Sequence, residues 1–189
     1  MGTINNNTGV QENSGGRGVR DVTIPAPFLS LFTGIATTVV FVIFVYAWKR
    51  LWNTPLTGII FKQIFFYLLV AIPAHELLHA LGFRIFSNMP WANIKFGFSL
   101  KNFVFYTHPD MPVNKAVYGW AVALPALTIG VMPLVLGLII GSLPLSSLGL
   151  ISIFNAAGDL LVLWKLREVG KEEQILDHPD KIGFQVVER

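Results

Sequence analysis

Two long stretches without charged residues constrain the fold of this 189-residue chain more than any other feature. No Asp, Glu, Lys or Arg occurs in the 27 residues between Asp21 and Lys49, or in the 43 residues between Lys115 and Asp159. A helix that crosses a bilayer needs about 20 consecutive apolar residues, so the first stretch has room for one span and the second for two. Charged residues make up only 13% of the chain. The sequence therefore predicts a multi-pass membrane protein.

Four spans are predicted along the chain. They run from about residue 27 to 48, 56 to 86, 116 to 140 and 148 to 166. The third contains Pro125 and Pro133, which are tolerated in a span where neighbouring groups bond the carbonyls that proline leaves free. A short connection, from Gly141 to Ser147, is expected between the third and fourth spans.

The loop between the second and third spans, residues 87–114, has a different pattern. Apolar Ile94, Phe96, Phe98 and Leu100 alternate with Lys95, Gly97, Ser99 and Lys101, and the alternation resumes at Phe103 and Phe105. A period of two is typical of a β-strand, so a β-hairpin that turns at Lys101 and Asn102 is predicted. An irregular amphipathic segment on the bilayer surface is the alternative. The expected fold class is an all-α membrane protein with about four transmembrane helices and a small β-hairpin between the second and third.

The distribution of basic residues predicts the orientation. Four spans place residues 1–26, the hairpin loop and residues 167–189 on one side of the membrane, and most Lys and Arg residues fall on that side. The loop after the first span has Lys49 and Arg50, and the connection before the fourth span has none. Basic loops stay cytoplasmic. We therefore expect a four-span domain over 27–166 in the cell membrane, with 1–26 as a flexible cytoplasmic tail and 167–189 as a second cytoplasmic tail.

Composition also excludes several classes of protein. The chain has no cysteine, which excludes disulfides, a thiol nucleophile and a cysteine-bound metal. No clustered basic face is visible, so no nucleic-acid partner is expected. The predicted partners are the lipid bilayer and a membrane-anchored peptide substrate, and the sequence leaves the oligomeric state open.

The second span contains the motif His75-Glu76-Leu77-Leu78-His79. An ionisable side chain at bilayer depth costs several kcal/mol unless it is paired or lies in a polar cavity. Residues four apart share a helix face, so both imidazoles can bind one zinc ion. Glu76 can then act as general base on a water whose pKa zinc lowers from about 16 toward 7. The alternative is a pair of structural histidines that hydrogen-bond to neighbours.

A third zinc ligand must come from elsewhere, because catalytic zinc usually takes three protein ligands. Ile85 occupies the position of the third His in metzincins, which excludes that subfamily. Asp159, the only Asp within a predicted span, and His108, in the hairpin loop, are the candidates. The cost of an unpaired charge in a span favours Asp159. Asn155, four residues earlier, is expected to share its helix face.

Several short motifs together resemble a known family. They are HELLHALGF, YTHPDMPV, the ALP of the third span and NAAGDL in the fourth. From about residue 61 onward the chain resembles the family named "putative zincin peptidase" and, more broadly, the site-2-protease-type intramembrane metalloproteases. The resemblance implies zinc bound by His75, His79 and Asp159, with Glu76 as base. One departure is the order Gly158-Asp159-Leu160, where site-2 proteases have Leu-Asp-Gly.

These features predict a zinc-dependent intramembrane metalloprotease. It would hydrolyse peptide bonds of membrane-anchored substrates near the cytoplasmic leaflet, with the hairpin holding the unwound substrate by strand pairing. The alternative is a non-catalytic membrane module, either a pseudoprotease or a metal-binding membrane protein. The presence of Glu76 argues against a pseudoprotease, because metal binding does not require a base. The first and third spans contain only scattered Thr and Ser, which argues against a metal carrier.

Overall fold

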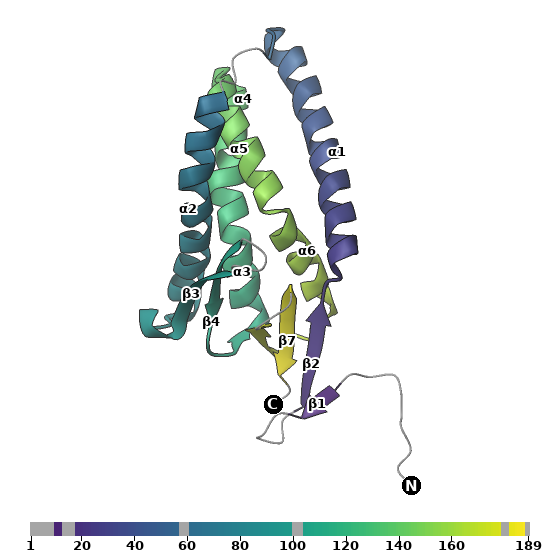
Figure 1. Cartoon of the computed structure of the whole chain (residues 1–189), viewed down its shortest axis with the longest axis vertical. Coiled ribbons are helices and arrows are strands. Elements are labelled where there is room, and N and C mark those ends of the chain that lie inside the picture. Colours follow the sequence, from purple (N-terminus) through teal and green to yellow (C-terminus); the bar gives the residue numbers. More distant parts are fainter. Residues whose placement is uncertain (1–9, 13–17, 57–60, 100–103, 179–181, 188–189) are drawn as a thin grey trace.

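The helices of this protein run roughly side by side, and its β-strands gather at one end of them (Figure 1). The computed structural model describes residues 10–12, 18–56, 61–99, 104–178 and 182–187. Strands β2 and β7 lie at the end where α1 begins, whereas α1 ends and α2 begins at the opposite end.

The first two helices are both 27 residues long. Helix α1 (Ala26–Trp52) has Pro27 in its first turn, where the missing amide proton costs no helical hydrogen bond. It ends at Asn53, which is in the left-handed conformation with φ of 47°. The Asn53 amide donates to the Lys49 carbonyl and closes the last turn. Helix α2 (Phe61–Ser87) carries the His-Glu motif in its second half.

The predicted third span is one apolar run, Lys115–Ile140, with a change of helix type inside it. Its parts are α3 (Lys115–Pro125), a π-helical segment η2 (Ala126–Val131) and α4 (Met132–Ile140). The Asn114 side chain caps α3 by accepting a hydrogen bond from the Val117 amide at 2.9 Å. The π-helical segment follows Pro125 directly, since a proline has no amide proton for the regular helical hydrogen bond.

The predicted fourth span is a bent pair of helices. Helix α5 (Leu143–Asn155) and helix α6 (Ala157–Lys165), which continues into a 3-10 turn η3 (Leu166–Glu168), meet at a bend of 48°. The pair starts earlier than predicted, because the Ser142 hydroxyl already caps α5 by accepting from the Leu145 amide at 3.5 Å. The predicted connection up to Ser147 is therefore too long.

Three helical runs in the described part of the chain are long and apolar enough to cross a membrane. They are α1, the Tyr67–Ser87 part of α2, and Lys115–Ile140. The bent α5–α6 pair makes a fourth if it is counted as one span.

The predicted β-hairpin is confirmed. Strands β3 (Ile94–Ser99) and β4 (Val104–Pro109) are antiparallel, with Ile94 opposite Pro109 and Ser99 opposite Val104. A 3-10 turn, η1 (Trp91–Asn93), leads into β3. The predicted turn at Lys101 and Asn102 lies outside the described residues.

A second sheet corrects the all-α class and the two predicted tails. Its five strands are β1 (Val10–Glu12), β2 (Gly18–Thr23), β5 (Val113–Asn114), β6 (Gln174–Asp177) and β7 (Gly183–Val187). They are antiparallel in the order β1-β2-β7-β6-β5, so residues within 1–26 pair with residues within 167–189. Phe184 and Val186 of β7 and Ile175 of β6 are fully buried, which supplies the apolar face that a sheet needs.

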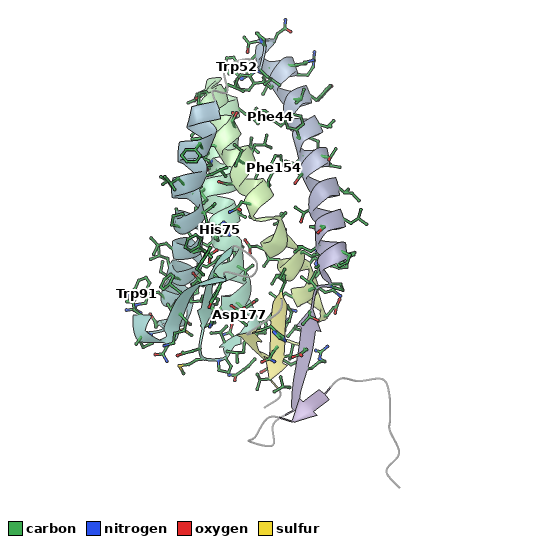
Figure 2. All side chains as sticks on the ribbon, in the orientation of Figure 1. Phe44, Trp52, His75, Trp91, Phe154 and Asp177 are labelled. Atoms are coloured by element: carbon green, nitrogen blue, oxygen red, sulfur yellow. The ribbon has the colours of Figure 1, made fainter. Side chains whose placement is uncertain are left out.

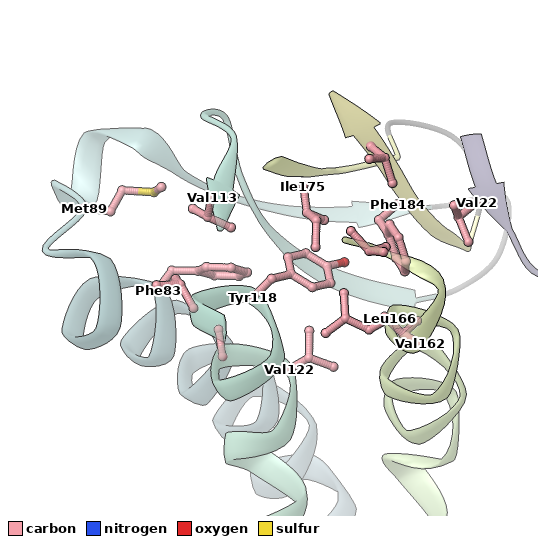
Figure 3. Packing of buried hydrophobic residues seen from close by; sticks show 14 of the residues in the cluster. Val22, Phe83, Met89, Val113, Tyr118, Val122, Val162, Leu166, Ile175 and Phe184 are labelled. Carbon is pink, nitrogen blue, oxygen red and sulfur yellow. The ribbon is translucent and has the colours of Figure 1, made fainter. Parts of the chain in front are cut away.

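The largest buried core lies between this sheet and α2, α3 and α6. Figure 3 shows Tyr118 of α3 between Phe83 of α2 and Phe184 of β7. The ring centroids of Tyr118 lie 6.1 Å from Phe83 and 5.7 Å from Phe184. A smaller cluster, built on Phe44 and Trp48 of α1, lies at the other end of the helices. The sheet thus supports the half of the helices that contains the His-Glu motif.

Candidate metal centre

His75 and His79 lie one turn apart on α2 and point into the protein. Their exposed fractions are 5% and 8%, so both imidazoles are removed from solvent. The two Nε2 atoms are 3.1 Å apart, and the rings are nearly perpendicular. Because helix residues at i and i+4 are neighbours on one face, the local sequence alone fixes this pair.

Asp159 joins the pair from the first turn of α6. Its Oδ2 lies 2.9 Å from Nε2 of His75 and 3.5 Å from Nε2 of His79. The bend between α5 and α6 places the start of a helix here, and a carboxylate is favoured at that position because the helix dipole is positive there. The structure thus brings together the three residues that the sequence predicted as ligands.

The arrangement of donor atoms fits a zinc ion. One atom from each of His75, His79 and Asp159 lies within 4.8 Å of the other two. Oδ2 of Asp159 is buried and, although close to both imidazoles, has no hydrogen bond of good geometry. Two imidazole nitrogens and one carboxylate oxygen are ligands that zinc accepts, and three leave a fourth position open. A bound cation would satisfy the buried carboxylate oxygen.

The orientation of His79 is set by a backbone group of α3. Its Nδ1 lies 3.0 Å from the carbonyl oxygen of Ala121, which can only accept, so Nδ1 carries a proton and Nε2 is the nitrogen left to bind a metal ion. Gly82 makes this contact possible. A Cβ at Gly82 would lie 2.6 Å from Cα of Ala121, so no larger residue leaves the two helices this close.

Glu76 is half-buried and occupies the same helical turn as the two histidines. The hairpin contacts this turn, because the Thr107 hydroxyl of β4 donates to the carbonyl oxygen of Glu76 at 3.1 Å. Thr107 is itself buried, with an exposed fraction of 8%. The contact places β4 directly beside the residue that the sequence predicts as general base.

Two further residues near the centre were not predicted. The Tyr118 hydroxyl of α3 donates a short hydrogen bond to Oδ1 of Asp177 on β6. Burial raises the pKa of Asp177 to about 6, and the nearby carboxylates of Asp159 and Glu76 act in the same direction. The sequence around Asp177 is polar and was predicted to be a tail. Its place near the centre depends on the hydrogen bond to Tyr118, which is distant in sequence.

His108 and Asn155 lie away from the cluster. His108 is in β4 opposite Lys95, and its ring stacks on Tyr106 with centroids 5.4 Å apart. Burial lowers the pKa of His108. Among the described residues, the three-donor cluster does not include it. Asn155 is exposed and ends α5, whereas Asp159 belongs to α6, so the predicted shared helix face does not form.

Comparison with known proteins identifies a family. A family model described as "Putative zincin peptidase" matches residues 68–173, more than half of the chain. The matched region includes the three donor residues and Glu76, and it ends just before β6. No curated protein and no solved structure matches the chain.

Proposed function

The chain belongs to the family described as "Putative zincin peptidase", and from this premise we propose that it is a zinc-dependent intramembrane metalloprotease related to the site-2 proteases. It hydrolyses peptide bonds of membrane-anchored substrates near the cytoplasmic leaflet. The observation that carries the proposal is the convergence of His75, His79 and Asp159 from two apolar helices, with Glu76 beside the first histidine. Such buried ionisable residues in a span are a functional site by default.

In this mechanism each residue has one role. His75, His79 and Asp159 would hold zinc, and the bound ion would supply Lewis-acid chemistry that activates water and the scissile carbonyl at neutral pH. The Glu76 carboxylate accepts a proton from the attacking water and delivers it to the departing amine nitrogen. The Ala121 carbonyl keeps the imidazole of His79 in one tautomer and orientation throughout the reaction.

The placement of the centre supports cleavage near one membrane face. Figure 2 shows His75 between the middle of the helices and the sheet end. Arg20, Lys95 and Lys115 lie in or beside the strands at the sheet end, whereas Lys49 and Arg50 lie in the last turn of α1 at the other end. By the positive-inside rule the sheet end is cytoplasmic. The centre then lies in the cytoplasmic half of the bilayer.

The β3–β4 hairpin offers a way to hold the substrate. A peptide bond within a helix is protected by helical hydrogen bonds, so the substrate must be extended before cleavage. A two-stranded sheet has free edges that can pair with an extended chain. Because Thr107 of β4 bonds to the backbone of Glu76, a substrate paired with the hairpin is delivered to the turn that carries the base.

The test compares new protein N-termini in cells. Membranes from cells that express wild-type protein are compared with those from cells that express Glu76→Gln, by N-terminal proteomics, and zinc is measured in each purified protein. Glu76→Gln keeps its zinc, because Glu76 is not a ligand, and loses the wild-type-specific N-termini that map to substrate spans. Glu168→Gln, on the exposed surface, is the matched control and behaves as wild type.

A wild-type protein without zinc contradicts the proposal. So does a Glu76→Gln variant that produces the same N-termini as wild type. Loss of zinc in Glu76→Gln would instead assign the carboxylate to metal binding and favour the non-catalytic module.

A further inference from the structure

The acceptor that orients His79 is unusual for a helix carbonyl. In a regular α-helix the carbonyl of Ala121 would accept the amide proton of the residue four positions later. That residue is Pro125, which has no amide proton. The next amide, of Ala126, donates to Ala123 instead. The Ala121 oxygen therefore lacks its helical donor, and Nδ1 of His79 lies 3.0 Å from it.

Resting on the proposed function, we propose that Pro125 is a positioning residue of the metal centre. By withholding an amide proton, Pro125 reserves the Ala121 carbonyl for Nδ1 of His79. The imidazole then carries its proton on Nδ1, and Nε2 faces Asp159 with its lone pair free for zinc. Pro125 acts through Ala121 and His79 and does not touch the metal itself.

The surroundings of Ala121 hold this carbonyl in place. Ala121 has an exposed fraction of 0%, so water does not replace the missing helical donor. Gly82 lets α2 approach α3 so closely that a Cβ at Gly82 would collide with Ala121. One turn earlier on α3, Tyr118 is hydrogen-bonded to Asp177 and packed against Phe83. The turn that presents the carbonyl is thus fixed from α2 and from the sheet.

A second proline in the same apolar run provides a matched control. Pro133 deprives the carbonyl of Ile129 of its regular helical donor, and the hydroxyl of Tyr67 lies 3.5 Å from that oxygen. Tyr67 also contacts the Ser152 hydroxyl at 2.5 Å. The two prolines thus have the same backbone chemistry, but only Pro125 frees a carbonyl that bonds to a proposed ligand.

The experiment measures zinc affinity and stability separately. Full-length wild type, Pro125→Ala and Pro133→Ala are purified in detergent, and zinc affinity is determined by chelator competition. Unfolding temperatures are measured in EDTA. Pro125→Ala lowers zinc affinity about 10–100-fold, as losses of supporting hydrogen bonds to metal ligands do. Its unfolding temperature in EDTA changes little, because the helix gains an amide donor while truncation of the buried Pro125 side chain leaves a small cavity. Pro133→Ala keeps the zinc affinity of wild type.

In Pro125→Ala the zinc affinity falls without a matching loss of stability, which a merely structural role would not produce. A wild type that binds no zinc overturns the proposed function and this inference together. A zinc-binding wild type whose affinity is unchanged in Pro125→Ala overturns the positioning role alone, and so do equal losses in both proline variants or an affinity loss that accompanies a lower unfolding temperature.

A second measurement does not depend on the variants folding. In metal-free wild type labelled with ¹⁵N-histidine, the His79 signal, assigned with His79→Gln, shows a proton on Nδ1. A proton on Nε2 with none on Nδ1 overturns the inference.

Discussion

Helices α1 and α2 have the same length, but only one of them contributes to the candidate metal centre. α1 is the more apolar of the two, and 6% of its most apolar window is buried inside the protein, compared with 33% for α2. α1 has no Asp, Glu, His, Lys or Arg before Lys49, whereas α2 carries His75, Glu76 and His79 in its buried half. The helix that carries the candidate metal ligands is therefore distinguished by its burial against other helices and not by its apolar character.

The two helices also differ in how they pack. α1 contacts the rest of the protein through Phe28, which lies against Trp164, and through the cluster around Phe44 and Trp48. Between these contacts, a Cβ added at Gly34 would meet no atom of another element within 4 Å. α2 instead packs closely on α3 at Gly82. A helix that mostly faces lipid needs only apolar side chains, whereas a packed helix needs particular side chains at particular positions.

The largest expected effect is on zinc content, which should fall after substitutions in α2 but not after a substitution in α1. His75→Ala or His79→Ala removes one of three ligands, so zinc falls from about one per chain to near zero. Thr38→Ala on α1, which removes only a hydrogen bond to the Gly34 carbonyl, leaves the zinc content unchanged. Zinc per chain in detergent-purified protein measures both. Retention of zinc in both histidine variants would place the metal elsewhere.

The comparison is sharpened at α6, which contacts α1 and carries Asp159. Asp159→Asn preserves shape but removes the charge that a zinc ligand provides, and it should weaken zinc binding at least about tenfold. His108→Ala should leave zinc binding unchanged, because His108 lies outside the donor cluster. The two variants are compared by their zinc occupancy after dialysis against a weak chelator. Full occupancy in Asp159→Asn with loss in His108→Ala would move the third ligand to the hairpin.

A pair of glycines tests the packing difference directly. Gly82→Ala on α2 inserts a methyl group 2.6 Å from Cα of Ala121 and should destabilise the protein by about 1–3 kcal/mol. Gly34→Ala on α1 meets nothing and should stabilise its helix by up to about 1 kcal/mol. Unfolding in detergent compares the two. Equal effects would show that α1 packs as closely as α2 in the membrane.

The smallest perturbation tests the orientation of both helices. Thr54→Cys, after the end of α1, and Ala92→Cys, after the end of α2, are exposed positions at opposite ends of the protein. An impermeant thiol reagent should label Thr54→Cys in intact cells and Ala92→Cys only after permeabilisation. Ser146, in the predicted connection between the third and fourth spans, cannot serve as a labelling position because its exposed fraction is 0%. The reverse labelling pattern would invert the proposed topology.

The sequence predicts the parts of the fold that depend on local pattern. The lengths of the apolar runs predict α1 and the Lys115–Ile140 run, and a period of two predicts β3 and β4. The spacing of His75 and His79 predicts that they share a helix face. Asp159 could be proposed as a ligand because an unpaired charge within an apolar span costs free energy. Its contact with the histidines, however, depends on the bend after Asn155.

The five-stranded sheet could not be predicted in the same way. β6 and β7 have four and five residues, and charged residues flank them, so their alternation is too short to stand out. Their pairing with β2 is set by contacts between distant residues, such as the hydrogen bond of 2.9 Å from Gln185 to Asp21. The role of the Ala121 carbonyl could not be predicted from the sequence either, because it contacts His79 only when α2 and α3 pack together.

The pairing of β2 with β7 fixes the order in which the protein can be completed. Gln185 and Asp21 are 164 positions apart, so β2 is synthesised before every helix and its partner strand after all of them. Until β7 has been synthesised, β2 lacks its partner on that side, and the core around Tyr118 lacks Phe184. Contacts this distant in sequence form late. The sheet that supports the candidate metal centre is therefore complete only after synthesis has passed β7.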